Sequence, residues 1–321
     1  MFSILLLRFK FAAELLTGEK QKMTVQNHTE CETTYSGKSY LNNGQIISLI
    51  TLNVIVMILN LIFNSAVIYG LVATKQLKNY SLKLILYLSI NDCCLALITQ
   101  TLFTVMLAKF EDCDFETIVQ FFAIFFTHIS AYIIALIGFD RYIHMRYLNR
   151  YAQVITNKRV IMILTAVVLL SLTQAMVYVL GTQLNFLSKA KQITVSIDAV
   201  IAISVFTAYI MTVRVVKVHS KRTESRDMLK AVDTTVTRTA SRILTAIVIC
   251  YIPYIIVSFT HAVVSQKWDG IRKQWLEYAL ILGFVLTYFN SFVNAIIFLS
   301  LNKKVKRYVT SVMKNRCSNT T

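Results

Sequence analysis

Seven long apolar runs divide the chain and limit the folds that it can adopt. A helix needs about 20 apolar residues to cross the roughly 30 Å hydrocarbon core of a membrane. In lipid, every backbone polar group must find its partner within the segment, so each run is expected to be helical. The runs lie near 46–73, 82–107, 117–143, 159–181, 195–217, 240–264 and 275–300. The sequence therefore predicts an all-α membrane protein, with a seven-transmembrane helix bundle over 46–301 between an N-terminal segment (1–45) and a tail (302–321).

The composition supports a membrane protein. Hydrophobic residues make up 56% of the chain and charged residues only 15%, whereas a soluble domain carries about 25% charged residues. Lys and Arg outnumber Asp and Glu by 33 to 16; in this context the excess points to loops that face anionic lipid rather than to nucleic acid. The six cysteines form no CxxC repeat, so neither a disulfide scaffold nor a zinc module is indicated.

The basic residues of the loops predict the orientation. They concentrate in the first, third and fifth connections and in the tail, whereas Lys109 in the second connection stands among acidic residues. Cytoplasmic loops carry the excess of Lys and Arg, so the N-terminal segment is predicted to be extracellular and the C-terminus cytoplasmic, in the plasma membrane. This orientation makes Asn27, in an Asn-His-Thr sequon, a glycosylation candidate.

The tail is predicted to begin with an amphipathic helix. The apolar face of a helix over 302–314 would hold Val305, Tyr308, Val309, Val312 and Met313. Basic residues fill the other face, as in helices that lie in the membrane interface. Cys317, just beyond, is a palmitoylation candidate, with an unmodified tail thiol as the alternative.

Polar residues inside the spans distinguish among seven-span proteins. The seventh span has no lysine between Trp275 and Leu301, which disfavours a retinal protein. The chain has one proline and no internal repeat, whereas transporters usually show repeats and broken helices. Asp92 is a carboxylate within the second span, and such a residue marks a functional site by default.

Oxygen-bearing side chains are predicted at the depth of Asp92. They are Asn64, Ser130, Asn290, Ser291 and Asn294. With these neighbours Asp92 is suited to hold Na⁺ or a proton. The alternative is a polar network that only holds the helices together.

Five short motifs follow one another at matching depths in the spans. They are Asn64 in the first span, Leu88 to Asp92 (Leu-x-x-x-Asp) in the second, Asp140-Arg141-Tyr142 ending the third, Cys250-Tyr-Ile-Pro253 in the sixth and Asn290-Ser-Phe-Val-Asn294-Ala-Ile-Ile-Phe298 in the seventh. Over all seven spans and the tail helix, the chain resembles the rhodopsin-like (class A) G-protein-coupled receptors, with no subfamily assigned. One such motif is weak evidence, but five in order are specific.

The resemblance implies an activation switch at the cytoplasmic end of the third span. In the family the arginine of the triplet, here Arg141, is linked in the inactive state to an acid at the cytoplasmic end of the sixth helix. Asp233 lies about 30 Å along the helix from Pro253, the depth required; the alternative is a solvated loop acid. Asp140 is expected to be the neighbouring partner of Arg141. In the active state Tyr209 would turn in beside Arg141, in the cavity that receives a heterotrimeric G protein.

The chain departs from the family at three positions of the switch. Tyr251 stands where relatives carry tryptophan at the base of the ligand pocket, and Ala295 and Phe298 replace the proline and tyrosine of NPxxY. Loss of the proline restores a backbone hydrogen bond and should straighten the seventh helix. Loss of the tyrosine hydroxyl removes a water bridge that supports the active state in relatives. The resemblance therefore implies signalling of unusual strength or basal activity.

The resemblance also implies sites in the extracellular half. Relatives link the top of the third span to a cysteine in the second extracellular loop; that loop has no cysteine here, and a Cys31–Cys113 disulfide is the hypothesis instead. Ala123 occupies the position of the aspartate of amine receptors, so a biogenic amine would lack its counter-ion. The ligand-pocket candidates are Gln120, Ala123, Phe126, Thr127, Tyr254, Phe284 and Tyr288. Such a pocket suits a small neutral or lipid-like molecule, or a short peptide; for each aromatic taken singly, helix packing is the alternative.

The sequence thus predicts a receptor that catalyses nothing itself, has no cofactor, and has Na⁺ as its candidate allosteric ion. Its expected partners are an extracellular ligand, a heterotrimeric G protein and membrane lipids, without nucleic acid. The alternative from another class is an ion-coupled secondary transporter or channel that uses Asp92. An enzyme is the weakest interpretation, because the sequence has no clustered nucleophile, metal-ligand set or phosphate-binding loop.

Overall fold

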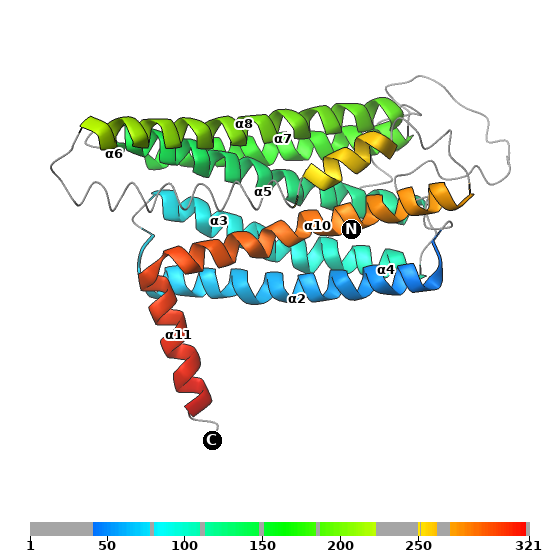
Figure 1. Ribbon diagram of the computed structural model, residues 1–321, viewed down its shortest axis with the longest axis horizontal. Coiled ribbons are helices and arrows are strands. Elements are labelled where there is room, and N and C mark those ends of the chain that lie inside the picture. The colour runs from blue at the N-terminus through cyan, green and yellow to red at the C-terminus, as the bar shows by residue number, and fades with distance from the viewer. Residues whose placement is uncertain are drawn as a thin grey trace. The chain divides into compact units, whose positions relative to one another are not determined.

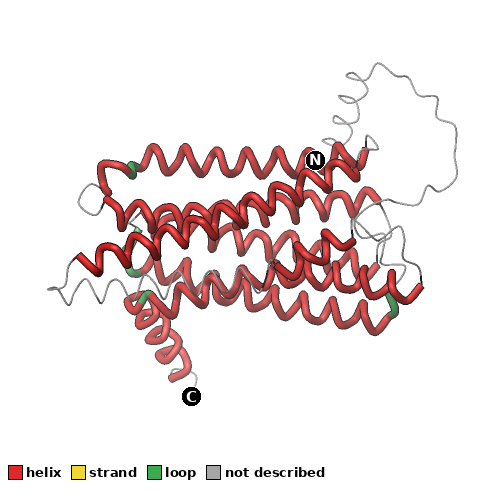
Figure 2. The backbone as a smooth tube through the Cα atoms, turned by 45° about the horizontal axis from the view of Figure 1, so that its top comes forward, coloured by secondary structure: helices red, strands yellow, loops and turns green. Residues whose placement is uncertain are grey.

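The computed structural model describes residues 41–77, 80–109, 113–147, 151–183, 187–222, 250, 252–261 and 270–318. Every regular element in these ranges is helical, which confirms the all-α prediction there (Figure 1, Figure 2). In chain order the elements are α2 (Asn43–Ala73), α3 (Tyr80–Cys94), the π-helical segment η2 (Leu95–Gln100), α4 (Thr101–Lys109), α5 (Cys113–Tyr147), α6 (Tyr151–Val154), α7 (Asn157–Gln183), α8 (Leu187–Arg222), α10 (Gly270–Leu301) and α11 (Lys303–Ser318). A further helix, Ile252–His261, lies between α8 and α10 in the sequence.

Five helices of the described part are long and apolar enough to cross a membrane. They are Asn43–Ala73, Tyr80–Ala108, Asp114–His144, Asn157–Gly181 and Gly270–Leu301, at the first four and the seventh predicted spans. Two shorter apolar stretches, Ala199–Val215 within α8 and the helix Ile252–His261, lie at the fifth and sixth predicted spans. Most of the sixth predicted span, including 240–249, lies outside the described residues.

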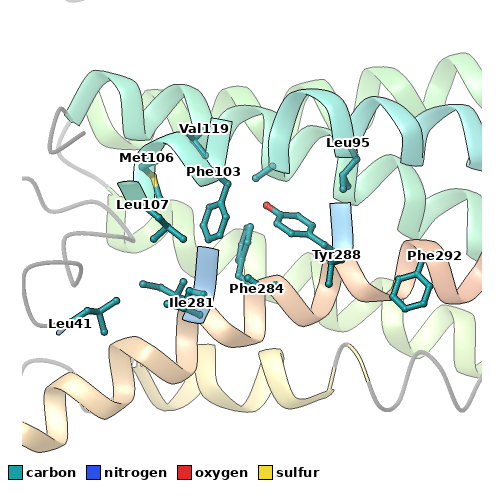
Figure 3. Close-up of a cluster of buried hydrophobic side chains, with 14 residues drawn as sticks. Leu41, Leu95, Phe103, Met106, Leu107, Val119, Ile281, Phe284, Tyr288 and Phe292 are labelled. Carbon is teal, nitrogen blue, oxygen red and sulfur yellow. The ribbon is translucent and has the colours of Figure 1, made fainter. Parts of the chain in front are cut away.

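Two helices organise the packing. α5 packs against α3, α7 and α8, and α2 packs against α3 and α10. The largest group of buried apolar side chains joins α2, α4, α5 and α10 and is rich in aromatic rings (Figure 3). In it the ring of Phe284 stacks on Phe103 at 6.2 Å and meets Tyr288 edge-on at 5.4 Å, measured between centroids. Such pairs contribute about 0.5–1.5 kcal/mol each beyond their area burial, so they hold α10 against the second span.

The second span contains a π-helical segment, Leu95–Gln100, that the sequence does not predict. A π-turn breaks the regular i to i+4 ladder, so its carbonyls need other donors. The Asn53 amide of α2 donates to the Gln100 carbonyl at 2.9 Å and to Thr104 Oγ1 at 2.8 Å. The Asn60 amide donates to Gln100 Oε1 at 2.9 Å. Because these amides are fully buried, α2 stabilises the π-segment from inside the bundle.

Replacing Asn53 with alanine is expected to destabilise the protein by about 1–2 kcal/mol, since the Gln100 carbonyl loses one of two side-chain donors and Gln100 Nε2 loses its acceptor, Asn53 Oδ1. The thermal unfolding midpoint of the detergent-solubilised protein measures the effect. Asn157→Ala is the matched control, because its exposed amide oxygen accepts a hydrogen bond from Lys83 at 2.7 Å and its loss should cost less. An unchanged midpoint for Asn53→Ala would show that α2 does not support the π-segment.

α11 leaves the end of α10 and packs against α2 (Figure 1). Asn302 makes the corner: its Oδ1 accepts from the Val305 N–H at 3.1 Å, and its amide donates to Gln76 at 3.1 Å. Val305 is fully buried against Gly70, where a Cβ would come within 2.5 Å of its side chain. An amphipathic helix therefore follows the seventh span. Cys317 falls in its last turn, but its side chain lies outside the described ones, so palmitoylation stays a prediction.

Candidate functional site

The last turns of α5 carry the Asp140-Arg141-Tyr142 triplet, and Asp140 is tied to two other elements. Ser81 Oγ of α3 donates to Asp140 Oδ2 at 2.5 Å, and the Tyr151 hydroxyl of α6 donates to Oδ1. Burial raises the pKa of Tyr151, and the hydrogen bond to Asp140 raises it further, so this hydroxyl keeps its proton and donates. The sequence predicts that Asp140 partners Arg141, but these two described side chains form no ion pair. The carboxylate is occupied by two hydroxyls instead.

A cavity of about 540 Å³ opens beside Arg141. Tyr209 of α8 and Asn294 and Phe298 of α10 also line it. Gly138 permits this arrangement, since a Cβ there would lie 3.3 Å from the ring of Tyr209. Tyr209 is buried, and its hydroxyl has no hydrogen-bond partner within the described part of the chain. Four of the predicted switch residues thus share one cavity, at what we call the Arg141 end of the bundle.

The other predicted switch residues are placed only in part. Pro253 is half-buried in the helix Ile252–His261. The Tyr142 hydroxyl accepts a hydrogen bond from Arg146, which is exposed. Asp233 and Tyr251 lie outside the described residues, so the Arg141–Asp233 pair stays a prediction.

Asp92 lies at the centre of a buried polar group. The carboxyl is fully buried, and Ser130 Oγ of α5 donates to its Oδ1 at 2.6 Å. Asn91 donates to Ser130 Oγ at 2.7 Å, and Ser291 of α10 adjoins the carboxyl from the other side. Asp92 Oδ2 and Asn290 Oδ1 have no hydrogen-bond partner in the described ranges, although both residues are buried. The structure therefore brings together three of the five predicted sodium-site residues, Asp92, Ser130 and Ser291, and Asn290 precedes Ser291 in α10.

This donor set fits a small hard cation. Hard cations take carboxylate, amide and hydroxyl oxygens as ligands, and two such oxygens, Asp92 Oδ2 and Asn290 Oδ1, are buried here without a donor. Asn294, the fifth predicted residue, lines the Arg141 cavity, and its amide nitrogen has no partner. The Asn64 amide donates to the Asn60 carbonyl at 3.1 Å, so its hydrogen bond lies within its own helix, α2.

A second cavity, of about 70 Å³, lies between α5, α8, the helix Ile252–His261 and α10. Of the seven predicted ligand-pocket residues, Ala123, Thr127, Tyr254 and Phe284 line it. Gln120, Phe126 and Tyr288 are not among its lining residues. Tyr288 is fully buried in the aromatic cluster instead (Figure 3). The cavity therefore includes four of the seven candidates, and Tyr288 belongs to the aromatic packing beside it.

The sequence profile described as 7 transmembrane receptor (rhodopsin family) matches residues 63–298, most of the chain. The chain belongs to the rhodopsin family of seven-transmembrane receptors. It is therefore a multi-pass membrane protein with the receptor fold that the motifs indicate, and its family is one of receptors rather than enzymes. A search of curated proteins gives no significant match.

The receptor's predicted disulfide is not placed by the structure. Cys31 lies outside the described residues, and Cys113 begins α5 with its side chain outside the described ones. A Cys31–Cys113 bridge stays a prediction. Cys93, Cys94 and Cys250 are free thiols, as expected for small residues packed inside spans.

Sequence reasoning missed a buried polar contact in this receptor, at the end of the bundle away from Arg141. His261 Nε2 lies 2.9 Å from Glu277 Oε1 of α10. Glu277 is 4% exposed, and its Oε2 has no hydrogen-bond partner among the residues that the structure describes. The signal was present: Glu277 is a carboxylate inside the predicted seventh span, and such a residue is a functional candidate by default.

Proposed function

We propose that this receptor binds an extracellular ligand within its helical bundle and activates a heterotrimeric G protein at the cytoplasmic face of the plasma membrane. The orientation rests on the excess of Lys and Arg in the first, third and fifth connections and in the tail of the sequence. The observation that carries the proposal is the cavity of about 540 Å³ that Arg141 shares with Tyr209, Asn294 and Phe298. A cavity at this end, lined by a cation and a buried unpaired hydroxyl, suits a protein partner that enters from the cytoplasm.

In the proposed mechanism, the two charged residues of the triplet have different roles. Ser81 and Tyr151 hold Asp140 in place, which leaves Arg141 able to change partners. In the resting state Arg141 would pair with Asp233. On activation the cytoplasmic part of the sixth helix would move outward about Pro253 and expose Arg141 to the G protein. The ligand drives this change only by binding the active state more tightly than the resting one.

Na⁺ at Asp92 is proposed as an allosteric ion. The buried acceptors Asp92 Oδ2 and Asn290 Oδ1 support it, and the site joins α3, α5 and α10, which carry parts of the switch. A cation that binds this arrangement would favour the state in which the three helices stay together. The ion would therefore oppose activation.

Replacing Phe298 with tyrosine is expected to raise basal signalling several-fold. Phe298 and Tyr209 line the same cavity, and the Tyr209 hydroxyl has no partner. A second hydroxyl there would restore the water bridge that the resemblance implies for relatives. Basal second-messenger level per receptor at the cell surface measures the effect. The control Phe289→Tyr places the same group elsewhere on α10; equal increases for both variants would rule out the proposed bridge.

Complex formation tests the proposed function. Full-length receptor in nanodiscs should co-elute with a heterotrimeric G protein after apyrase removes free nucleotide, and GTPγS should dissociate the complex. Co-elution that is lost on nucleotide addition supports the proposal. No complex with any of the Gs, Gi, Gq or G12 classes, together with a potential-dependent ion flux in vesicles, would favour the transporter alternative.

A further inference from the structure

Three helices place a buried or half-buried polar side chain seven residues from a residue that lines the cavity of about 70 Å³. The pairs are Gln120 and Thr127 in α5, Tyr254 and His261 in the helix Ile252–His261, and Glu277 and Phe284 in α10. Seven residues make two helical turns, or about 10.5 Å, so each polar residue lies on the cavity-lining face of its helix. In all three helices the polar residue is the one further from the Arg141 end. We call this set the polar level.

Contacts between the sixth and seventh spans fix the register of this level. Tyr254 meets Phe284 edge-on, with ring centroids 5.6 Å apart, and His261 Nε2 lies 2.9 Å from Glu277 Oε1. From the aromatic contact to the polar contact, the chain advances seven residues in the helix Ile252–His261. In α10 it goes back seven residues. The helices approach closely here, since a Cβ at Gly283 would lie 3.3 Å from Tyr254 Cα. The His261–Glu277 contact therefore lies directly beyond the aromatic pair that lines the cavity.

Two atoms of the polar level have no hydrogen-bond partner among the described residues. Glu277 is 4% exposed and its Oε2 is unpaired; Gln120 is 2% exposed and its Nε2 is unpaired. Buried polar atoms without partners reduce stability, and carboxylates do so most. One of these atoms is a carboxylate acceptor and the other is an amide donor. A molecule that binds both must present a donor, best a cation, beside an accepting oxygen.

We infer that Gln120, His261 and Glu277 recognise the polar head of the extracellular ligand, and that this head carries an ammonium or guanidinium group beside an accepting oxygen. Glu277 Oε2 accepts hydrogen bonds from the cation, and Gln120 Nε2 donates to the oxygen. His261 holds the other carboxylate oxygen and so orients Glu277. A short apolar group extends toward the cavity of about 70 Å³. This inference rests on the proposed function, and it selects a short peptide over a neutral or lipid-like ligand.

The position of the anion also explains how a cation can bind a receptor with alanine at position 123. Ala123 lines the cavity without offering a charge, so the third span supplies no counter-ion. The carboxylate lies two turns further out and on α10. The cation would therefore sit near the mouth of the bundle, with its apolar part beneath it.

Charge-selective labelling tests this site without any G protein. In Gln120→Cys receptor in nanodiscs, the introduced thiolate attacks a methanethiosulfonate reagent, forms a disulfide and releases methanesulfinate. The probes are the cationic 2-(trimethylammonium)ethyl reagent and the anionic 2-sulfonatoethyl reagent, with the rate at position 120 read by peptide mass spectrometry. The ratio of cationic to anionic rates is expected to fall at least tenfold when Glu277→Gln is added, because a nearby carboxylate attracts one probe and repels the other.

Three variants make the outcome decisive. Glu277→Asp and His261→Gln keep the carboxylate and should keep the cationic preference. Glu116→Gln removes a carboxylate four residues before Gln120, where the residue is 8% exposed, and should change the ratio by less than threefold. The inference is overturned if Glu277→Gln leaves the ratio unchanged, if Glu116→Gln changes it more, or if neither probe labels position 120. If labelling behaves as expected but no G-protein complex forms, the result contradicts the proposed G-protein coupling and leaves the ligand-site inference standing.

Discussion

Replacing Arg141 with alanine is expected to lower receptor-stimulated nucleotide exchange at least about tenfold. Arg141 is the guanidinium that lines the cavity proposed for the G protein. Hydrogen bonds to charged groups contribute about 1.5–3 kcal/mol, and about 1.4 kcal/mol corresponds to a factor of ten. Arg141 has no ion-pair partner among the described residues. Its removal should therefore reduce G-protein coupling without unfolding the receptor.

GTPγS binding to a purified G protein, normalised to folded receptor, measures this loss. Arg146→Ala is the matched control: it removes the same charge from the same end of α5, but from an exposed side chain whose described hydrogen bond is to Tyr142. Arg146→Ala should retain most of the exchange activity. If both variants lose activity equally, net charge at this face explains the effect, and the specific role of Arg141 is wrong.

Replacing Asp92 with asparagine is expected to abolish stabilisation of the receptor by Na⁺. A ligand at ten times its Kd stabilises the folded state by about 1.4 kcal/mol, which raises the unfolding midpoint by roughly 2–4 °C. Asp92 supplies the one carboxylate of the proposed site, and its Oδ2 is buried without a partner. Asparagine keeps the shape but removes the charge that makes binding of a monovalent cation favourable.

The unfolding midpoint in NaCl, compared with N-methylglucamine chloride at the same ionic strength, isolates the Na⁺ effect. Ser291→Ala should weaken it, because Ser291 adjoins the carboxyl. Asp114→Asn, which removes an exposed acid from the first turn of α5, should leave it unchanged. A Na⁺ shift that survives Asp92→Asn, or that wild type lacks, would contradict the ion site.

Much of the fold and part of the site follow from local sequence. Long apolar runs are sufficient to predict the helices, because lipid leaves the backbone few alternatives. The grouping of Asp92 with Ser130 and Ser291 follows from depth within helices of known direction, whereas the grouping of Arg141 with Tyr209 comes from the family resemblance. Depth along a helix is a single coordinate, and the position of a residue within its predicted span gives that coordinate.

What sequence could not supply depends on side-chain packing between helices. Asp140 is held by Ser81 and Tyr151 rather than by Arg141. These partners lie on α3 and α6, and the sequence pattern does not define how these helices are rotated about their axes. Tyr288 was predicted to line the pocket, but its ring packs against Phe103 instead. The π-segment arises from amides on a neighbouring helix. Glu277 differs from these, because its position inside a span was a readable signal.

The most direct test of the central claim is catalysed nucleotide exchange by the receptor itself. Wild-type receptor in nanodiscs, mixed with each of the Gs, Gi, Gq and G12 heterotrimers, should accelerate GTPγS binding by at least one of them above the rate with empty nanodiscs. Arg141→Ala should remove the acceleration, and Arg146→Ala should not. No acceleration of any heterotrimer by folded receptor would contradict the assignment of a G-protein-coupling cavity to the Arg141 end.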